Sequence, residues 1–137
     1  MMKVLGIGID LFQISRIEKI ISKRGGFLSD FSKRFAKRIL NDKYEIPVFE
    51  KLSAENDKHR CVQMLAGSWA TKEALFKSLD HEKQKRFQFR DWYRHYEKNG
   101  KVHIKNDENE VNEEILLSIS HDAGLVVAYV LRQTIVE

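Results

Sequence analysis

The chain has 137 residues, of which 42% are hydrophobic and 32% are charged, and it contains 7 glycines and 1 proline. This composition excludes a disordered tail, a collagen-like fibre and a low-complexity linker, and the length suits one domain over residues 1–137. The formal charge of +4 favours acidic partners, but no usual signature of nucleic-acid binding is found. The single Cys61 and the lack of an apolar run of roughly 18 to 20 residues predict an intracellular protein without a membrane partner.

The first predicted element is a strand over residues 4–11 with two different faces. Its leucine and isoleucine side chains alternate with Gly6, Gly8 and Asp10. We expect the apolar face to join the core. The other face is nearly bare backbone that ends in a carboxylate, so we expect a bulky or charged group to approach it closely. A turn or helix N-cap role is the alternative for Asp10.

Two basic amphipathic helices are predicted next. In the first, isoleucines recur at helical spacing over residues 14–21, and Gly25-Gly26 ends the helix. Its basic side chains lie on the opposite stripe: Arg16, Lys19 and Lys23. The second helix covers roughly residues 29–40 and leads into a polar stretch around Pro47. The simplest interpretation of this charge is a solvated basic face.

A long helix is predicted over residues 57–79, and it carries a carboxylate inside its apolar stripe. At about 100° per residue, Glu73 falls among the apolar side chains of one face, which are Val62, Leu65, Ala66, Trp69 and Phe76. Lys72 and Lys77 are expected at the edges of this stripe. Because burying an unpaired carboxylate is costly, a compensating cation is expected. The alternative is an ordinary ion pair between Glu73 and Lys77.

Two hairpins are predicted after this helix. The first covers residues 87–105, with the strong turn signal Asn99-Gly100 between its strands. The second covers residues 115–131 and turns at residues 122–124. The charged segment 80–86, which precedes both hairpins, is expected to be a solvated loop. The alternative is that Lys83, Lys85 or Arg86 contacts phosphate groups.

Asp10 and Glu73 together predict an open site for a hard divalent cation. Two carboxylates, one from a strand end and one from a buried helix, can share Mg²⁺, which prefers oxygen ligands and keeps water or phosphate in its shell. Too few protein ligands are visible for a closed cage, so we expect a phosphate-bearing substrate, with Lys77 as a point charge beside it. His121, at a strand end, is a further candidate, with a surface or hydrogen-bonding role as the alternative.

Residue chemistry alone leaves other functions open. A basic binding module for RNA or for an acidic protein would use Glu73 only as a structural ion pair. A metal-dependent phosphodiesterase would use the same carboxylates to turn over a phosphodiester. The residue types and their spacing do not distinguish these functions from other reactions at a phosphate group.

Three motifs, taken in order, resemble one family. They read Gly-Ile-Gly-Ile-Asp at residues 6–10, Trp-Ala-Thr-Lys-Glu-Ala-Leu-Phe-Lys at residues 69–77 and Ser-Ile-Ser-His-Asp at residues 118–122. Their combination is similar to the 4′-phosphopantetheinyl transferases of the short holo-[acyl-carrier-protein] synthase type, over essentially the whole chain. The pattern Trp-x-x-Lys-Glu-Ala-x-x-Lys is the most specific of the three.

This resemblance implies a reaction and the residues that perform it. The phosphopantetheine arm of coenzyme A would pass to a serine of an apo acyl carrier protein, with release of adenosine 3′,5′-bisphosphate. Asp10 and Glu73 would hold Mg²⁺, and Glu73 and Lys77 would be catalytic. Coenzyme A would be bound by three basic residues: Arg60, Lys77 and His121. The acidic helix of the carrier protein would dock on the basic helix through Arg16, Lys19 and Lys23.

The resemblance also implies a fold and an assembly. We expect an α+β domain in which a small, mainly antiparallel sheet packs on the long central helix, and a homotrimer with active sites between subunits. The sequence Gly67-Ser68-Trp69 is similar to fungal members, which predicts a mitochondrial protein, or otherwise a cytoplasmic one. Many bacterial relatives have an arginine where Ser68 stands, so one coenzyme A contact is expected to be missing or replaced.

Overall fold

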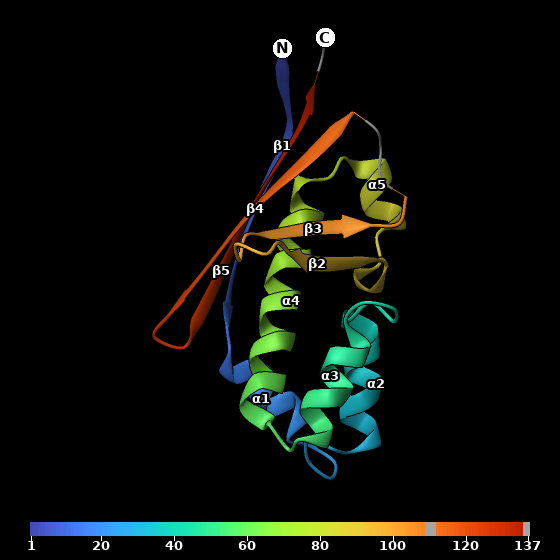
Figure 1. Ribbon diagram of the computed structural model, residues 1–137, viewed down its shortest axis with the longest axis vertical. Coiled ribbons are helices and arrows are strands. Elements are labelled where there is room, and N and C mark those ends of the chain that lie inside the picture. The colour runs from blue at the N-terminus through green and yellow to red at the C-terminus, as the bar shows by residue number, and fades with distance from the viewer. Residues whose placement is uncertain (109–111, 136–137) are drawn as a thin grey trace.

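The computed structural model describes residues 1–108 and 112–135, which form two antiparallel sheets and several helices (Figure 1). The elements in chain order are β1 (Met2–Gln13), α1 (Ser15–Ile21), α2 (Asp30–Ile39), α3 (Ile46–Ala54), α4 (Lys58–Ser78), α5 (His81–Arg86), a 3₁₀ turn (Phe89–Asp91), β2 (Trp92–Tyr96), β3 (Val102–Asn106), β4 (Glu113–Asp122) and β5 (Leu125–Ile135). One sheet has the order β1-β5-β4, and β2 and β3 form a separate hairpin. All pairs are antiparallel, so the expected α+β architecture and both hairpins are confirmed.

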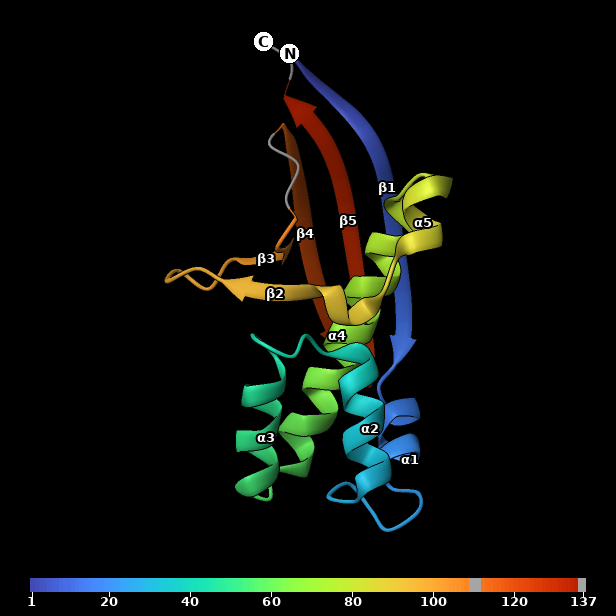
Figure 2. The ribbon, with the colours of Figure 1, turned by 90° about the vertical axis from the view of Figure 1, so that its right-hand side faces the viewer.

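The long helix α4 lies at the centre of the molecule, with β1 and β5 on one side and α2 and α3 beside its first half (Figures 1 and 2). It begins after Asp57, whose carboxylate accepts a hydrogen bond from the Arg60 backbone N–H at 3.1 Å. Its fully buried apolar side chains form the middle of the core: Cys61, Leu65, Ala70, Ala74 and Leu75. None of the helices in the described ranges combines the length and apolarity needed to cross a membrane.

The two faces of β1 are used in the opposite way from the sequence prediction. A Cβ atom at Gly8 would lie 1.8 Å from the Ala74 carbonyl oxygen, and one at Gly6 would lie 2.0 Å from that of Ser78. The close approach is therefore made by the α4 backbone, not by a ligand. The side chains expected in the core are instead 43 to 65% exposed in the single chain: Leu5, Ile7, Ile9 and Leu11. That prediction was wrong because alternation separates two faces without showing which one meets the helix.

Two segments for which the sequence predicts no helix are helical. Pro47 lies in the first turn of α3, where a missing backbone N–H removes no helical hydrogen bond. The predicted loop over residues 80–86 is wrong, since α5 begins after Asp80, whose carboxylate accepts from the Lys83 backbone N–H at 3.0 Å. The first basic helix is shorter than expected: α1 ends at Ile21, so Lys23 lies beyond it.

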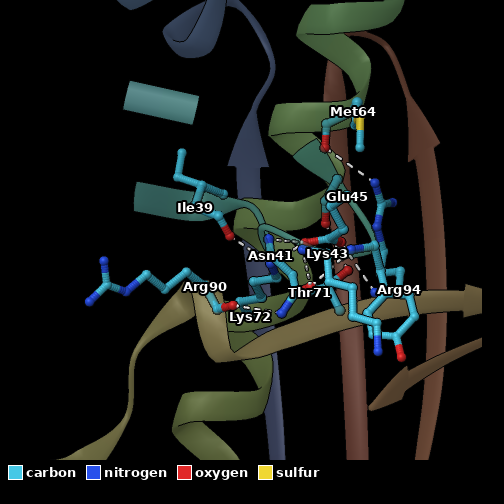
Figure 3. Close-up of polar contacts among 11 residues, drawn as sticks. Ile39, Asn41, Lys43, Glu45, Met64, Thr71, Lys72, Arg90 and Arg94 are labelled. Carbon is cyan, nitrogen blue, oxygen red and sulfur yellow. Dashed lines mark hydrogen bonds and ion pairs between the residues drawn. The ribbon is translucent and has the colours of Figure 1, made fainter. Parts of the chain in front are cut away.

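Lys72 lies in the core and not at the edge of the apolar stripe. Its ammonium donates to Glu45 Oε1 and to the Ile39 carbonyl oxygen, both at 2.6 Å, and its side chain is fully buried (Figure 3). Burial lowers the pKa of Lys72 to about 8, although the Glu45 carboxylate acts in the opposite direction. The pair ties α4 to the end of α2 and the start of α3. Removing one partner of such a buried pair typically costs about 3–5 kcal/mol.

Candidate active site

Asp10, Glu73 and Lys77 meet where β1 crosses the second half of α4. The Lys77 ammonium donates to Asp10 Oδ1 at 3.1 Å and to the Ile9 carbonyl oxygen at 3.0 Å. Glu73 lies one helical turn before Lys77, close enough to Asp10 for the two carboxylates to repel. Lys77 therefore forms an ion pair with Asp10. The alternative based on helical spacing predicted an ion pair between Lys77 and Glu73 instead.

The surroundings of these carboxylates favour an additional positive charge. Partial burial raises the pKa of Glu73, the Asp10 carboxylate raises it further, and Lys77 lowers it. The Asp10 side chain is 13% exposed, and its Oδ2 atom is buried without a hydrogen-bond partner in the described part of the chain. Buried carboxylate oxygens normally have a partner, so this pair of groups fits a bound cation.

Asp10 and Glu73 suit a hard divalent cation such as Mg²⁺. Both supply carboxylate oxygens, which are the ligands that this ion prefers. Within residues 1–108 and 112–135, no group of three or more His, Cys, Asp or Glu side chains could hold a metal ion. Two protein ligands would leave most of the coordination sphere to water and to a substrate phosphate, as the sequence prediction of an open site requires.

Arg60 and His121 lie away from the carboxylates within one chain. Arg60 is in the first turn of α4, and thirteen residues of helix place it roughly 20 Å from Glu73 along the axis. Its side chain is 71% exposed and lies 3.5 Å from Asp57. His121 lies near the end of β4, which is separated from β1 by β5. A single chain therefore does not bring these two predicted coenzyme A contacts to Asp10.

His121 instead lines a cleft of about 640 Å³ between α3, the first half of α4, the β2/β3 hairpin and the tip of the β4/β5 hairpin. The cleft also contains Arg94, which the sequence reasoning did not single out. Its Nη2 atom donates to the Met64 carbonyl oxygen at 3.2 Å, and its backbone N–H donates to Glu45 Oε2 at 3.2 Å (Figure 3). The sequence pattern that could have identified Arg94 is its position two residues from both Trp92 and Tyr96, which places the three side chains on one face of a strand.

The residues predicted to dock a carrier protein follow the carboxylate-bearing strand β1 along the chain. α1 follows β1 directly, so the basic side chains begin six residues after Asp10. All three are exposed: Arg16, Lys19 and Lys23. The Arg16 guanidinium lies 4.8 Å from the centre of the buried Phe12 ring, which limits its motion. The contact with Phe12 therefore keeps Arg16 near the end of β1, the strand that carries Asp10.

Comparisons of the sequence and of the fold with known proteins all identify the same family. A family model described as the 4′-phosphopantetheinyl transferase superfamily matches residues 6–130. A holo-[acyl-carrier-protein] synthase of Enterococcus faecalis is 30% identical, covering 96% of this chain and 98% of that protein. One from Buchnera aphidicola is 33% identical, covering 76% of this chain and 72% of that protein. A crystal structure of a holo-(acyl-carrier-protein) synthase from Bacillus anthracis in complex with CoA (3′,5′-ADP) has a TM-score of 0.68 and 25% identity, covering 96% of this chain and 98% of that chain.

Proposed function

The chain belongs to the 4′-phosphopantetheinyl transferase superfamily as a short holo-[acyl-carrier-protein] synthase, and we propose that it transfers the 4′-phosphopantetheine arm of coenzyme A to a serine of an apo acyl carrier protein. The other product would be adenosine 3′,5′-bisphosphate. The observation that carries the proposal is the meeting of Asp10, Glu73 and Lys77. These are the residues that the family resemblance assigns to the metal and to the phosphate.

In the proposed mechanism, the chain binds and orients the diphosphate of coenzyme A. Asp10 and Glu73 would hold Mg²⁺, which neutralises diphosphate charge when bound. Lys77 supports the same charge from 3.1 Å beside Asp10. The serine oxygen of the carrier protein bonds to the phosphorus that bears pantetheine, and the bridging oxygen leaves with the adenosine bisphosphate. The serine proton would pass to Glu73 or to a bound water beside it.

The proposed reaction is tested by mass spectrometry of an apo acyl carrier protein after incubation with this protein, coenzyme A and Mg²⁺. We expect a gain of about 340 Da, the mass of the transferred arm. Glu73→Gln should abolish the gain without unfolding the chain, while Glu50→Gln, an exposed substitution on α3, should leave it unchanged. Full activity of Glu73→Gln would remove this residue from the mechanism. Absence of the gain with the wild-type protein would contradict the function itself.

The basic surface of Arg16, Lys19 and Lys23 would dock the carrier protein. Its support is exposure, charge and position next to Asp10. Arg16→Glu should raise the KM for the carrier protein roughly tenfold, because charge reversal opposes an acidic partner, and should change the KM for coenzyme A much less. Arg38→Glu, an equal charge reversal at an exposed site on α2, is the control. Equal increases of both KM values in Arg16→Glu would contradict the docking assignment.

The proposed assembly is a homotrimer with active sites between subunits. Its support is the outer face of the three-stranded sheet, where large apolar side chains are exposed in the single chain: Ile7, Ile9, Leu11, Leu125 and Tyr129. A contiguous apolar surface of this kind is typical of a protein interface. Pairing between subunits would also supply Arg60 and His121 to carboxylates on another subunit.

The fungal origin and the mitochondrial location expected from Gly67-Ser68-Trp69 stay proposals. They are supported by that short sequence alone, since the two relatives described above are bacterial. A cytoplasmic location is the alternative. Fluorescence microscopy of the tagged protein in its native cell distinguishes the two locations.

A further inference from the structure

The cleft that contains His121 also contains a guanidinium without an acidic partner. Among the described residues, no carboxylate lies within ion-pair distance of the Arg94 side chain. Its Nη2 atom donates to the Met64 carbonyl oxygen, whereas its Nε atom is buried and has no hydrogen-bond partner in the same part of the chain. A buried donor on a cation is normally satisfied, so a partner for Arg94 is missing from the isolated chain.

Glu45 does not compensate this charge. One of its oxygens accepts from the Lys72 ammonium and the other from the neutral backbone N–H of Arg94, so the negative charge of Glu45 pairs with Lys72 and not with the Arg94 guanidinium. The positive charge of Arg94 contributes to lowering the pKa of Lys72, after the larger effect of burial. Glu45 is the only acidic residue among the described residues that line the cleft. Lys72, Arg94 and Glu45 together therefore carry one positive charge that no other carboxylate among the described lining residues offsets.

A second cleft, larger than the one that contains Arg94, lacks this excess of positive charge. It has a volume of about 880 Å³ and is lined by both basic and acidic side chains. Two of these, Lys83 and Glu113, already pair at 3.4 Å. The charge pattern therefore points to the smaller cleft as the anion site.

The backbone of α4 is shaped to accept the guanidinium. A Cβ atom at Gly67 would lie 2.6 Å from Arg94 Nη1, so the guanidinium lies directly against the helix where a glycine leaves room. The Met64 carbonyl holds its other end, which fixes the direction of the remaining donors (Figure 3). Other lining groups suit the sugar, base or phosphate of a nucleotide: Tyr44, Gln63, Tyr96 and His121.

We propose that Arg94 binds the phosphomonoester at the nucleotide end of coenzyme A, with His121 beside it. This inference rests on the proposed function. Arginine presents paired donors that match phosphate oxygens, and a partly buried guanidinium binds an anion more strongly than an exposed one. The diphosphate is assigned to Asp10 of β1 and Glu73 of α4. The cleft lies elsewhere in the same chain, near the tip of β4. In the proposed homotrimer, one coenzyme A would contact the carboxylates of one subunit and the cleft of its neighbour.

The kinetic test compares coenzyme A with 3′-dephospho-coenzyme A, which lacks the phosphomonoester. Arg94→Met should raise the KM for coenzyme A roughly 10- to 100-fold, as expected for a lost charged hydrogen bond. It should leave kcat within about threefold and the KM for the dephospho form unchanged, because the rest of the co-substrate does not contact Arg94. Arg94→Lys should keep part of the affinity. Arg90→Met, at an exposed arginine outside the cleft, is the matched control.

Binding measurements separate this inference from the proposed function. By calorimetry, the wild-type protein should prefer adenosine 3′,5′-bisphosphate to adenosine 5′-monophosphate, and Arg94→Met should lose that preference. Circular dichroism during heating shows whether the variant is folded. An equal loss for both co-substrates would show a structural role and overturn the inference, as would a retained preference in Arg94→Met. A wild-type protein that binds with this preference but transfers nothing would refute the transferase function alone.

Discussion

At Glu73 the surroundings favour the protonated carboxyl group. Partial burial and the neighbouring Asp10 raise its pKa, and Lys77 opposes them. In the metal-free protein, the folded state therefore binds a proton at this position more readily than the unfolded chain does. Above the raised pKa, the ionised carboxylate lowers the free energy of unfolding. As the pH falls through the raised pKa towards the ordinary value of 4.5, this penalty disappears.

Glu73→Gln tests this balance without an activity measurement. At pH 7 and without metal, we expect the variant to be at least as stable as the wild type in urea unfolding, and we expect that advantage to vanish below pH 4.5. Added Mg²⁺ should raise the Tm of the wild type and not that of Glu73→Gln, because only the former keeps both ligands. Glu50→Gln should respond to Mg²⁺ as the wild type does. A clearly destabilised Glu73→Gln at pH 7 would show that the carboxylate has a structural partner.

Whether a residue could be predicted from the sequence depends on where its partners lie. Glu73 was found because a carboxylate interrupts an apolar helical stripe, which is a local pattern. Lys72 is predicted at the edge of that stripe because its partner Glu45 is 27 residues away, in a segment interpreted only as polar. Arg94 was missed for the same reason: it contacts Glu45 and Met64, which are 49 and 30 residues away.

At the scale of elements, the contact between β1 and α4 positions the site. Gly6 and Gly8 let the strand lie directly on the helix backbone, and Asp10, the next residue on that face, then reaches Lys77. The two glycines therefore determine the position of Asp10 relative to α4, because they allow β1 and α4 to lie close together. A side chain at either glycine would separate the strand from the helix.

Gly8→Ala should disturb both stability and activity. Its Cβ atom would lie 1.8 Å from the Ala74 carbonyl oxygen, a contact that requires backbone movement. We expect the free energy of unfolding to fall by about 1–3 kcal/mol and transfer activity to fall with the displacement of Asp10. Gln13→Ala, at an exposed end of the same strand, should change stability by less than about 0.5 kcal/mol. Urea denaturation checks both values, and an unchanged Gly8→Ala would contradict the close packing.

The short helices α3 and α5 are the two α-helices that the sequence does not predict. The β2/β3 hairpin was predicted because Asn99-Gly100 specifies its turn locally. α5 was missed because its six residues bury no side chain, so no apolar period marks them. α3 is absent from the prediction because the stretch around Pro47 is interpreted only as polar, although a proline in the first turn is compatible with a helix.

At the scale of the whole molecule, the three-stranded sheet is covered on one face only. α4 packs on the inner face (Figure 2). The outer face carries exposed apolar side chains along β1 and β5. The sequence prediction that the leucines and isoleucines of β1 are buried fails for the single chain. In the proposed homotrimer, that prediction would hold between subunits, because the interface would cover the outer face.

Ile9→Glu tests the assembly and the division of the site between subunits. Ile9 is 57% exposed in the single chain, and a glutamate there would have to be desolvated in an interface, so sedimentation should show a monomer where the wild type is a trimer. Leu28→Glu, at an exposed leucine outside the sheet, should stay trimeric. Asp10 and Glu73 lie within one chain, so the monomer should keep its Mg²⁺-dependent rise in Tm. It should lose coenzyme A binding, because Arg60 and His121 of its own chain do not reach those carboxylates. A wild-type monomer that transfers the arm at full rate would contradict the shared site.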